Sequence, residues 1–149
     1  MKRIAILALA ALIMAAIVAT AAYAAPRIFT HTAVGTNGND DLIAPFGRIG
    51  QQDTAYGLNG RDEIFGDNGD DKLYGGNGND RILSDYEADY IVGGQGRDYL
   101  SGNAHADIIE AADGQKDYVY CGSGENDRAS VDEKDVVGGC EFVNGEPAE

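Results

Sequence analysis

The chain has 149 residues, with 25 acidic residues against 11 lysines and arginines, and its formal net charge is −14. Such an acidic chain repels the phosphate backbone of DNA and RNA, which excludes a nucleic-acid partner. Acidic chains with few large apolar residues are often disordered, so a folded structure requires some regular feature in the sequence.

The first expected element is an export signal over residues 1–24. Two basic residues at positions 2 and 3 lead into an uncharged apolar stretch over residues 4–22, the pattern of a secretory signal peptide. We expect cleavage before Ala25, a lead-in over residues 25–34, and a secreted mature chain that is not stably inserted in a membrane. An uncleaved membrane anchor is the alternative, because the apolar run is only slightly shorter than the roughly 20 residues that span a bilayer. Cleavage would remove the two basic residues of the signal, so the mature chain would carry 9 basic and 25 acidic residues, a net charge of −16.

The second expected element is an array of nine-residue repeats. Aspartate recurs at an unbroken spacing of nine, at Asp53, Asp62, Asp71, Asp80, Asp89, Asp98 and Asp107, and disordered acidic tracts have no reason to keep such a period. Two residues after each aspartate stands an apolar or small side chain, so each step predicts a short strand: Ala55, Ile64, Leu73, Ile82, Ile91, Leu100 and Ile109. Glycine recurs at the first and fourth positions before the aspartate, which predicts turns: Gly57 and Gly60, Gly66 and Gly69, Gly75 and Gly78, Gly93 and Gly96.

Residues 75–83, GGNGNDRIL, resemble the G-G-x-G-x-D-x-U-x nonapeptide of RTX, or haemolysin-type, calcium-binding proteins. Similar copies stand at residues 57–65, 66–74 and 93–101, and an outlying copy at residues 35–43 contains Asp40 and Leu42. The resemblance covers most of residues 35–110. It implies an all-β fold, a parallel β-roll or β-solenoid, in which each repeat supplies a six-residue turn and a three-residue strand, and two repeats complete one coil.

The resemblance also implies Ca²⁺ as the cofactor, and the residue chemistry supports this independently. Glycine permits positive φ and brings backbone carbonyls together, while aspartate adds the hard anionic oxygen that calcium prefers. Turns of successive 18-residue coils would stack about 4.8 Å apart, so one cation could bridge them. The expected ligands are the carboxylates of Asp40, Asp62, Asp71, Asp80, Asp89, Asp98 and Asp107, with backbone carbonyls around Gly57, Gly60, Gly66, Gly69, Gly75, Gly78, Gly93 and Gly96.

Alternate repeats place their turns on opposite edges of such a roll, which predicts unequal calcium binding. One edge carries the turns that end at Asp62, Asp80 and Asp98, all with both glycines; the other carries those that end at Asp53, Asp71, Asp89 and Asp107, of which only residues 66–71 keep both. Asp80 lies between two intact turns, so its replacement should cost more calcium binding than the replacement of Asp89.

Several segments depart from the repeat. Residues 44–47 are the expected insertion, a loop between the outlying copy and the main array; the turn at residues 84–89 lacks both glycines, and that at 102–107 lacks the second. Beyond Asp107 the aspartate spacing becomes 10, 10 and 8, at Asp117, Asp127 and Asp135. We therefore expect the roll to continue through degenerate repeats over residues 111–140, and residues 141–149 to form a C-terminal tail.

The two cysteines, Cys121 and Cys140, are expected to form a disulfide within the degenerate repeats. Export places them in an oxidising compartment, and an even count favours pairing. Their separation of 19 residues is one coil plus one residue, so they should lie at nearly the same angle on adjacent coils. Zinc binding is the less favoured reading, because two thiols without a histidine cluster make a poor tetrahedral site.

We expect no enzyme, because nearly every residue after position 35 belongs to the repeat. His31 and His105 are interpreted as surface residues, and Ser123 lacks the G-x-S-x-G context of a hydrolase nucleophile. The predicted function is that of a secreted calcium-binding β-roll whose folding is coupled to calcium. The alternative is a cell-surface adhesion protein or structural scaffold that uses the roll as a binding face, with a protein or surface partner that the sequence does not identify.

Overall fold

The computed structural model of the protein describes residues 27–28, 32–43 and 51–148; the predicted signal peptide, His31 and the predicted insertion at residues 44–47 lie outside this part of the chain. One sheet has seven strands: β1 (Arg27–Ile28), β3 (Asp41–Ile43), β5 (Glu63–Asn68), β7 (Arg81–Tyr86), β9 (Tyr99–Ala104), β11 (Tyr118–Ser123) and β13 (Val136–Gly138). The other has eight: β2 (Thr32–Val34), β4 (Thr54–Asn59), β6 (Lys72–Asn77), β8 (Tyr90–Gln95), β10 (Ile108–Glu110), β12 (Arg128–Ser130), β14 (Phe142–Val143) and β15 (Glu146–Pro147).

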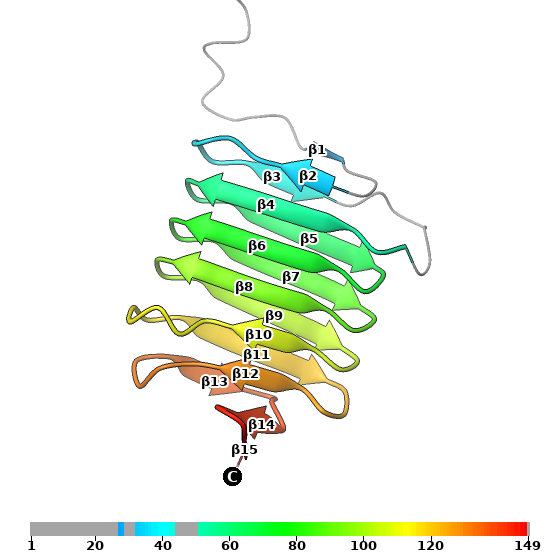
Figure 1. Ribbon diagram of the computed structural model, residues 1–149, viewed down its shortest axis with the longest axis vertical. Coiled ribbons are helices and arrows are strands. Elements are labelled where there is room, and N and C mark those ends of the chain that lie inside the picture. Colours follow the sequence, from blue (N-terminus) through cyan, green and yellow to red (C-terminus); the bar gives the residue numbers. More distant parts are fainter. Residues whose placement is uncertain (1–26, 29–31, 44–50, 149) are drawn as a thin grey trace, which may run out of the picture.

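The strands alternate between the two sheets along the chain, so two consecutive strands complete one coil (Figure 1). Apart from the pair β14–β15, the pairing within each sheet is parallel and joins residues one coil apart, as in Leu73 with Ile91 and Ile64 with Ile82. The elements described are all strands. The predicted parallel β-roll is therefore confirmed. The described residues contain no helix that is long and apolar enough to cross a membrane.

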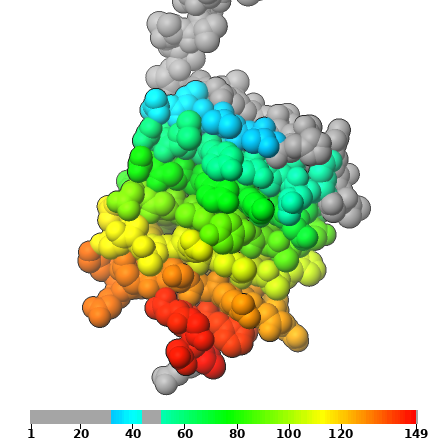
Figure 2. All heavy atoms as spheres, viewed as in Figure 1, coloured from blue at the N-terminus to red at the C-terminus, as the bar shows by residue number. Residues whose placement is uncertain are grey.

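The core is a narrow column between the sheets, to which strands β2 to β12 each contribute the apolar side chain of their second residue. In β5, for example, only Ile64 and Gly66 are buried, and their neighbours are partly exposed. The wholly buried apolar residues are those that the D-x-apolar step predicts, from Leu42 and Ala55 through Ile64, Leu73, Ile82, Ile91, Leu100 and Ile109. The coils form successive bands along the long axis of the molecule (Figure 2). Each repeat thus buries only about one large apolar side chain.

The strands are longer than the resemblance implied. Strands β4 to β9 and β11 have six residues each, against the three expected, so the six-residue turn expected between strands is shortened. The reason is that turn residues of successive coils also pair with one another, as Leu58 does with Gly76 and Gly76 with Gly94. The ladder of backbone hydrogen bonds therefore runs on into the glycine-rich segments.

The degenerate repeats continue the roll. Tyr118 in β11 pairs with Tyr99 in β9, and β13 pairs with β11 in turn. The segment expected to be a tail contains two strands: β14 extends the eight-stranded sheet, and β15 folds back on it in antiparallel pairing. This hairpin turns at Asn144 and Gly145, which both have positive φ, as a two-residue type I′ turn requires.

Candidate calcium sites

The turns form two columns, one on each edge of the roll. We call edge one the column of residues 35–40, 57–62, 75–80, 93–98, 111–117 and 132–135, which lead from the eight-stranded to the seven-stranded sheet. Edge two is the column of residues 66–71, 84–89, 102–107, 121–127 and 139–141, which lead from the seven-stranded sheet back to the eight-stranded sheet. The alternation agrees with the arrangement expected from the sequence. Asp40 and Asp117 join Asp62, Asp80 and Asp98 on edge one.

An aspartate ladder runs the length of edge one. The backbone N–H of Asp62 donates to Oδ1 of Asp80 (2.8 Å), and that of Asp80 donates to Oδ1 of Asp98 (2.8 Å). The ladder begins at Asp40, whose N–H donates to Oδ1 of Asp62 (2.8 Å), and it continues through Asp117. Each carboxylate therefore satisfies a buried backbone donor of the preceding coil, a role that does not involve a metal.

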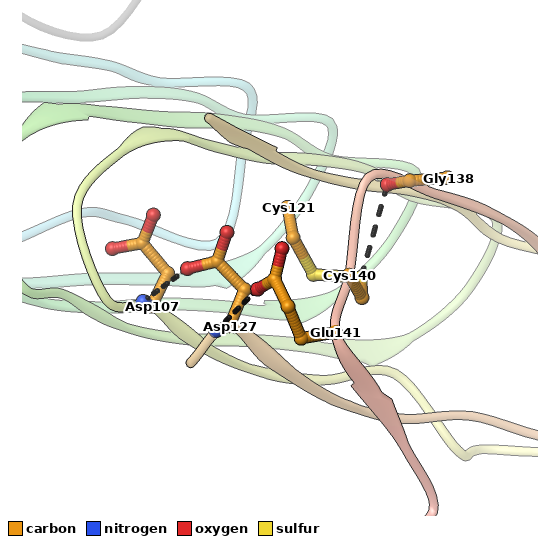
Figure 3. The surroundings of a disulfide bond; sticks show 6 residues. All are labelled: Asp107, Cys121, Asp127, Gly138, Cys140 and Glu141. Atoms are coloured by element: carbon orange, nitrogen blue, oxygen red, sulfur yellow. Dashed lines mark hydrogen bonds between the residues drawn. A yellow bond between two sulfur atoms is a disulfide. The ribbon is translucent and has the colours of Figure 1, made fainter. Parts of the chain in front are cut away.

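Edge two carries an equivalent ladder, although most of its turns have lost glycine. The N–H of Asp71 donates to Oδ1 of Asp89 (2.7 Å), and that of Asp89 to Oδ1 of Asp107 (2.9 Å). At the C-terminal end the N–H of Asp107 donates to Asp127, and Asp127 donates to Oε2 of Glu141 (2.8 Å), so a glutamate closes the column (Figure 3). The nine-residue aspartate period is thus a backbone requirement on both edges.

The second carboxylate oxygen is the feature that suits a cation. On edge one, Oδ2 is buried and has no hydrogen-bond partner among the described residues at Asp62, Asp80, Asp98 and Asp117. On edge two the same holds at Asp71, Asp89, Asp107 and Asp127. A buried carboxylate oxygen without a partner carries a large desolvation cost. A bound Ca²⁺ would remove that cost, because it takes anionic and carbonyl oxygens as ligands.

Backbone carbonyls supply the other half of such a site, and glycine at the first turn position lets them approach. A Cβ added to Gly75 would lie 2.5 Å from Oδ2 of Asp80 and 2.5 Å from the carbonyl oxygen of Gly93 in the next coil. Gly57 has the same relation to Asp62 and the Gly75 carbonyl. Within residues 32–43 and 51–148 no three His, Cys, Asp or Glu side chains converge on one point. The donor set here is therefore carboxylate plus carbonyl, and it fits calcium.

Burial raises the pKa of the ladder carboxyls above the usual value of 3.8, to about 6 for Asp62 and Asp80 and to about 8 for Asp89. The hydrogen bond from the neighbouring backbone N–H lowers the pKa by less than burial raises it, and adjacent ladder aspartates raise it further. The pKa rises to about 7 for a further group: Asp71, Asp98, Asp107 and Asp117. These pKa values show that the folded roll without a cation disfavours its own ionised carboxylates.

Side chains interrupt the glycine positions on edge two. Ser84 occupies the first position of its turn, is fully buried, and donates from Oγ to the carbonyl oxygen of Gly102 (2.9 Å). That carbonyl is the counterpart of those that surround the glycine positions of edge one. At the second and fourth positions of the same turn, Asp85 and Glu87 take positive φ (78° and 72°). The turn thus keeps positive φ at these two positions despite the loss of glycine, and holds ordinary residues in a costly conformation.

The two cysteines also lie on edge two. Cys121 follows the register of Gly102, because Tyr120 pairs with Ser101 and Gly122 with Asn103. The sulfur atoms of Cys121 and Cys140 are 1.97 Å apart, the Cα atoms 5.0 Å apart, and Cys121 is fully buried (Figure 3). The Cα separation is within the usual range for a disulfide. A cysteine therefore stands where a turn of the repeat would have its first glycine.

The sequence interpretation missed two features of these edges. It placed Asp117 and Asp127 in the degenerate repeats from their D-x-apolar step, but it did not show that these aspartates and Glu141 extend the ladders. Ser84 was noticed only as a missing glycine, and its hydrogen bond to a carbonyl one coil away could not be seen in the sequence. The expected ligands from Asp40 to Asp107 all lie on the two edges. From Asp62 to Asp107 one carboxylate oxygen accepts the ladder hydrogen bond and the other has no partner among the described residues, whereas Oδ2 of Asp40 accepts hydrogen bonds from Thr36.

Comparison with known proteins identifies the repeats. Residues 50–82 and 84–115 match the RTX calcium-binding nonapeptide repeat (4 copies). The search of curated proteins found no match, and neither did the search of solved structures. The matched segments contain strands β4 to β10 and the turns of both edges between them.

Proposed function

We propose that this chain of RTX calcium-binding nonapeptide repeats is a secreted β-roll protein that folds when it binds calcium outside the cell. The observation that carries the proposal is the pair of buried carboxylate columns, in which the second oxygen of most aspartates has no hydrogen-bond partner among the described residues. The columns also lie within a chain of strong net negative charge. Folding without a cation would bring these charges together in a poorly solvated place.

The energetics favour coupling of folding to the metal. Each repeat buries about one large apolar side chain, which contributes roughly 1.5–3 kcal/mol, whereas ordering nine residues of backbone costs roughly 1–2 kcal/mol each. The backbone ladders offset part of this cost. Calcium supplies further free energy, because a cation that binds only the folded state stabilises that state. The proposed role is binding and folding, with no catalysis.

Secretion is part of the proposal and rests on the N-terminal sequence pattern alone, which lies outside the described residues. Extracellular calcium is abundant enough to occupy weak sites, and we expect dissociation constants of about 10⁻⁴–10⁻³ M, as in extracellular calcium modules. The chain would then stay unfolded until export and fold on arrival.

The test is a calcium titration of the mature chain from Ala25, followed by calorimetry and by circular dichroism. We expect a largely unstructured chain in chelator and a gain of β structure that saturates together with the heat of calcium binding. An identical β-rich spectrum with and without chelator would show that folding does not need calcium, and the proposal would fall.

A second candidate, a surface scaffold with the roll as binding face, is favoured by one feature of the seven-stranded sheet. The Arg81 guanidinium lies over the rings of Phe65 and Tyr99, 5.6 and 5.7 Å from their centroids. Arg97 and Lys116 lie over Tyr118, at 5.5 and 5.3 Å. Aromatic rings that hold cations in place make a pre-organised surface for an anionic partner.

This candidate predicts retention at the cell surface that depends on these cations. The variant R81Q/R97Q should release the protein into the medium, whereas R128Q, which removes an arginine stacked on Phe142 in the other sheet, should not. Complete release of the unmodified chain would leave the secreted calcium-binding protein as the better account.

A further inference from the structure

The turns contain a chemical feature that calcium binding alone does not explain: asparagine followed by glycine. Such pairs occur at residues 37–38, 59–60, 68–69, 77–78 and 144–145. In an Asn–Gly pair the glycine nitrogen can attack the asparagine Cγ. A Cγ–N bond to the backbone forms, the bond from Cγ to Nδ2 breaks, and ammonia leaves with the backbone proton. Water then opens the five-membered imide at either carbonyl, which gives aspartate or isoaspartate.

The fold ties up the attacking nitrogen in four of the five pairs. The N–H of Gly60 donates to the carbonyl oxygen of Asn77 (2.8 Å), and that of Gly78 donates to the carbonyl oxygen of Gln95 (2.7 Å). The N–H of Gly69 donates to Oε2 of Glu87 (3.0 Å). The N–H of Gly38 makes a longer bond to Oγ1 of Thr36 (3.2 Å). The bonds from Gly60, Gly78 and Gly69 join different coils, so they exist only in the folded roll. The bond from Gly38 is local to its own turn.

The asparagine side chains on edge one are held as well. Asn77 donates from Nδ2 to Oδ1 of Asn59 (2.7 Å), and Asn59 donates in the same way to Asn37. This amide ladder holds the side chains against those of the neighbouring coils. Gly60 and Gly78 take positive φ and lie close to the backbone of the coil before them. Attack on Cγ needs both groups to reorient, so the reaction must wait for local opening of the roll.

The fifth pair lacks this protection. Asn144 and Gly145 form the tip of the β14–β15 hairpin, both are exposed, and a Cβ on Gly145 would meet no atom within 4 Å. The Asn144 side chain is held by a hydrogen bond from the N–H of Val131 to Oδ1 (2.9 Å), but the N–H of Gly145, the attacking nitrogen, has no hydrogen-bond partner among the described residues. Asn144 is therefore the position at which the folded protein can react.

We propose that deamidation at the Asn–Gly pairs limits the time for which the calcium-free chain can still fold. This inference rests on the proposed coupling of folding to calcium. Without calcium all five pairs are open to attack, and with calcium only Asn144 reacts at an appreciable rate. The modification disables edge one, because aspartate at position 59 or 77 is acceptor-only and cannot donate along the amide ladder. Isoaspartate adds one carbon to the main chain of a strictly periodic coil.

The experiment compares three incubations of the mature chain in mildly alkaline buffer: with calcium, with chelator, and with calcium plus concentrated urea. Peptide mass spectrometry with an isoaspartate assay follows each pair. We expect modification of Asn59 and Asn77 to be about tenfold slower or more in calcium than in urea, because the reaction samples only the opened fraction. Chelator should match urea, and Asn144 should react in all three.

The control is the variant N144Q. It should show no appreciable deamidation in calcium, and its Asn59 and Asn77 should still be deamidated in chelator. After calcium is restored, the β structure recovered by a chelator-aged sample should fall in proportion to the modified fraction at residues 59 and 77. Equal rates at Asn59 in calcium and in urea would overturn the inference. Protection in chelator but not in urea would instead contradict the coupling of folding to calcium, while it would support protection by the fold.

Discussion

The two edges of the roll share the same aspartate ladder and differ in the residues at the glycine positions of their turns. Both have an unbroken ladder in which an aspartate carboxylate accepts the N–H of the coil before it. On edge one, glycine leaves room beside the second carboxylate oxygen for carbonyls of the next coil. On edge two, Ser84 and Cys121 replace two of these glycines, whereas Gly66 and Gly102 keep the same contacts. Aspartate at a spacing of nine therefore marks the coil, and glycine at the first and fourth positions marks the turn that can hold calcium.

The edges also differ in how their turns are held without a metal. Edge two has covalent and hydrogen-bonded links between coils, from the paired cysteines and from the Ser84 hydroxyl. Edge one relies on close backbone contact and on the amide ladder of Asn37, Asn59 and Asn77. We infer that the turns of edge one depend on calcium for their order more than the turns of edge two do.

The largest expected effect comes from filling a fourth-position glycine on edge one. A Cβ at Gly78 would overlap the carbonyl oxygen of Gly60, at a φ of 138° that side chains rarely adopt. Gly78→Ala should lower the free energy of unfolding in saturating calcium by about 3 kcal/mol or more. The matched change on edge two, Glu87→Ala, removes only a hydrogen-bond acceptor for Gly69, and should cost about 1 kcal/mol.

Denaturant unfolding of both variants in saturating calcium measures the difference. A loss at Gly78 no larger than that at Glu87 would mean that the coils can separate to accept a side chain, and the distinction between the edges would lose its steric basis.

The pairing of Cys121 with Cys140 should matter next. Closing a loop of this length contributes roughly 3 kcal/mol in the chain-entropy model. The double variant C121S/C140S should lose hydrogen-exchange protection in β11 to β14 and keep it in the turns at residues 57–62 and 75–80, even in saturating calcium. Free alkylation of both cysteines in protein taken from the medium would show that edge two has no such link.

Much of this arrangement was readable in the sequence. The resemblance to the RTX nonapeptide implied the coil of two repeats and the alternation of edges, and the D-x-apolar step predicted the core column from Leu42 to Ile109. The spacing could not predict the six-residue strands, since glycine segments carry no strand propensity and pair only because the coils stack. The ladder role of aspartate was hidden too, because a carboxylate that binds a backbone N–H and one that binds calcium look alike in a sequence.

The smallest expected effect is a difference in pH dependence between Asp89 and Asp62 without calcium; other ladder aspartates, such as Asp98 on edge one and Asp107 on edge two, share a pKa of about 7. The folded-state pKa is about 8 for Asp89 and about 6 for Asp62, against the usual 3.8. At a pH between the usual pKa of 3.8 and the raised folded-state pKa, each of these carboxyls holds more protons in the folded chain than in the unfolded chain. The metal-free roll therefore gains stability as pH falls and loses it as pH rises. In chelator, β structure should therefore increase as the pH is lowered from about 8 to about 5.

The variant D89N should flatten this dependence above about pH 6, whereas D62N should flatten it mainly below that value, because each removes its own titration. Circular dichroism in chelator across the pH range is the measurement. A metal-free chain that becomes more structured toward alkaline pH would contradict the sign, and with it the view that burial of these carboxylates opposes folding.

The most direct test of the unequal edges is calcium calorimetry on two matched variants, D80N and D89N. In each, the amide Oδ1 can still accept the N–H from the preceding coil, Asp62 in one case and Asp71 in the other, so the ladder survives and only the charge and one possible calcium ligand are lost. We expect D80N to lower the calcium stoichiometry and to weaken calcium-induced folding, while D89N leaves the stoichiometry unchanged and makes the calcium-free chain easier to fold. Equal losses of bound calcium from the two variants would contradict the account, because they would show that calcium follows the aspartates on both edges regardless of glycine.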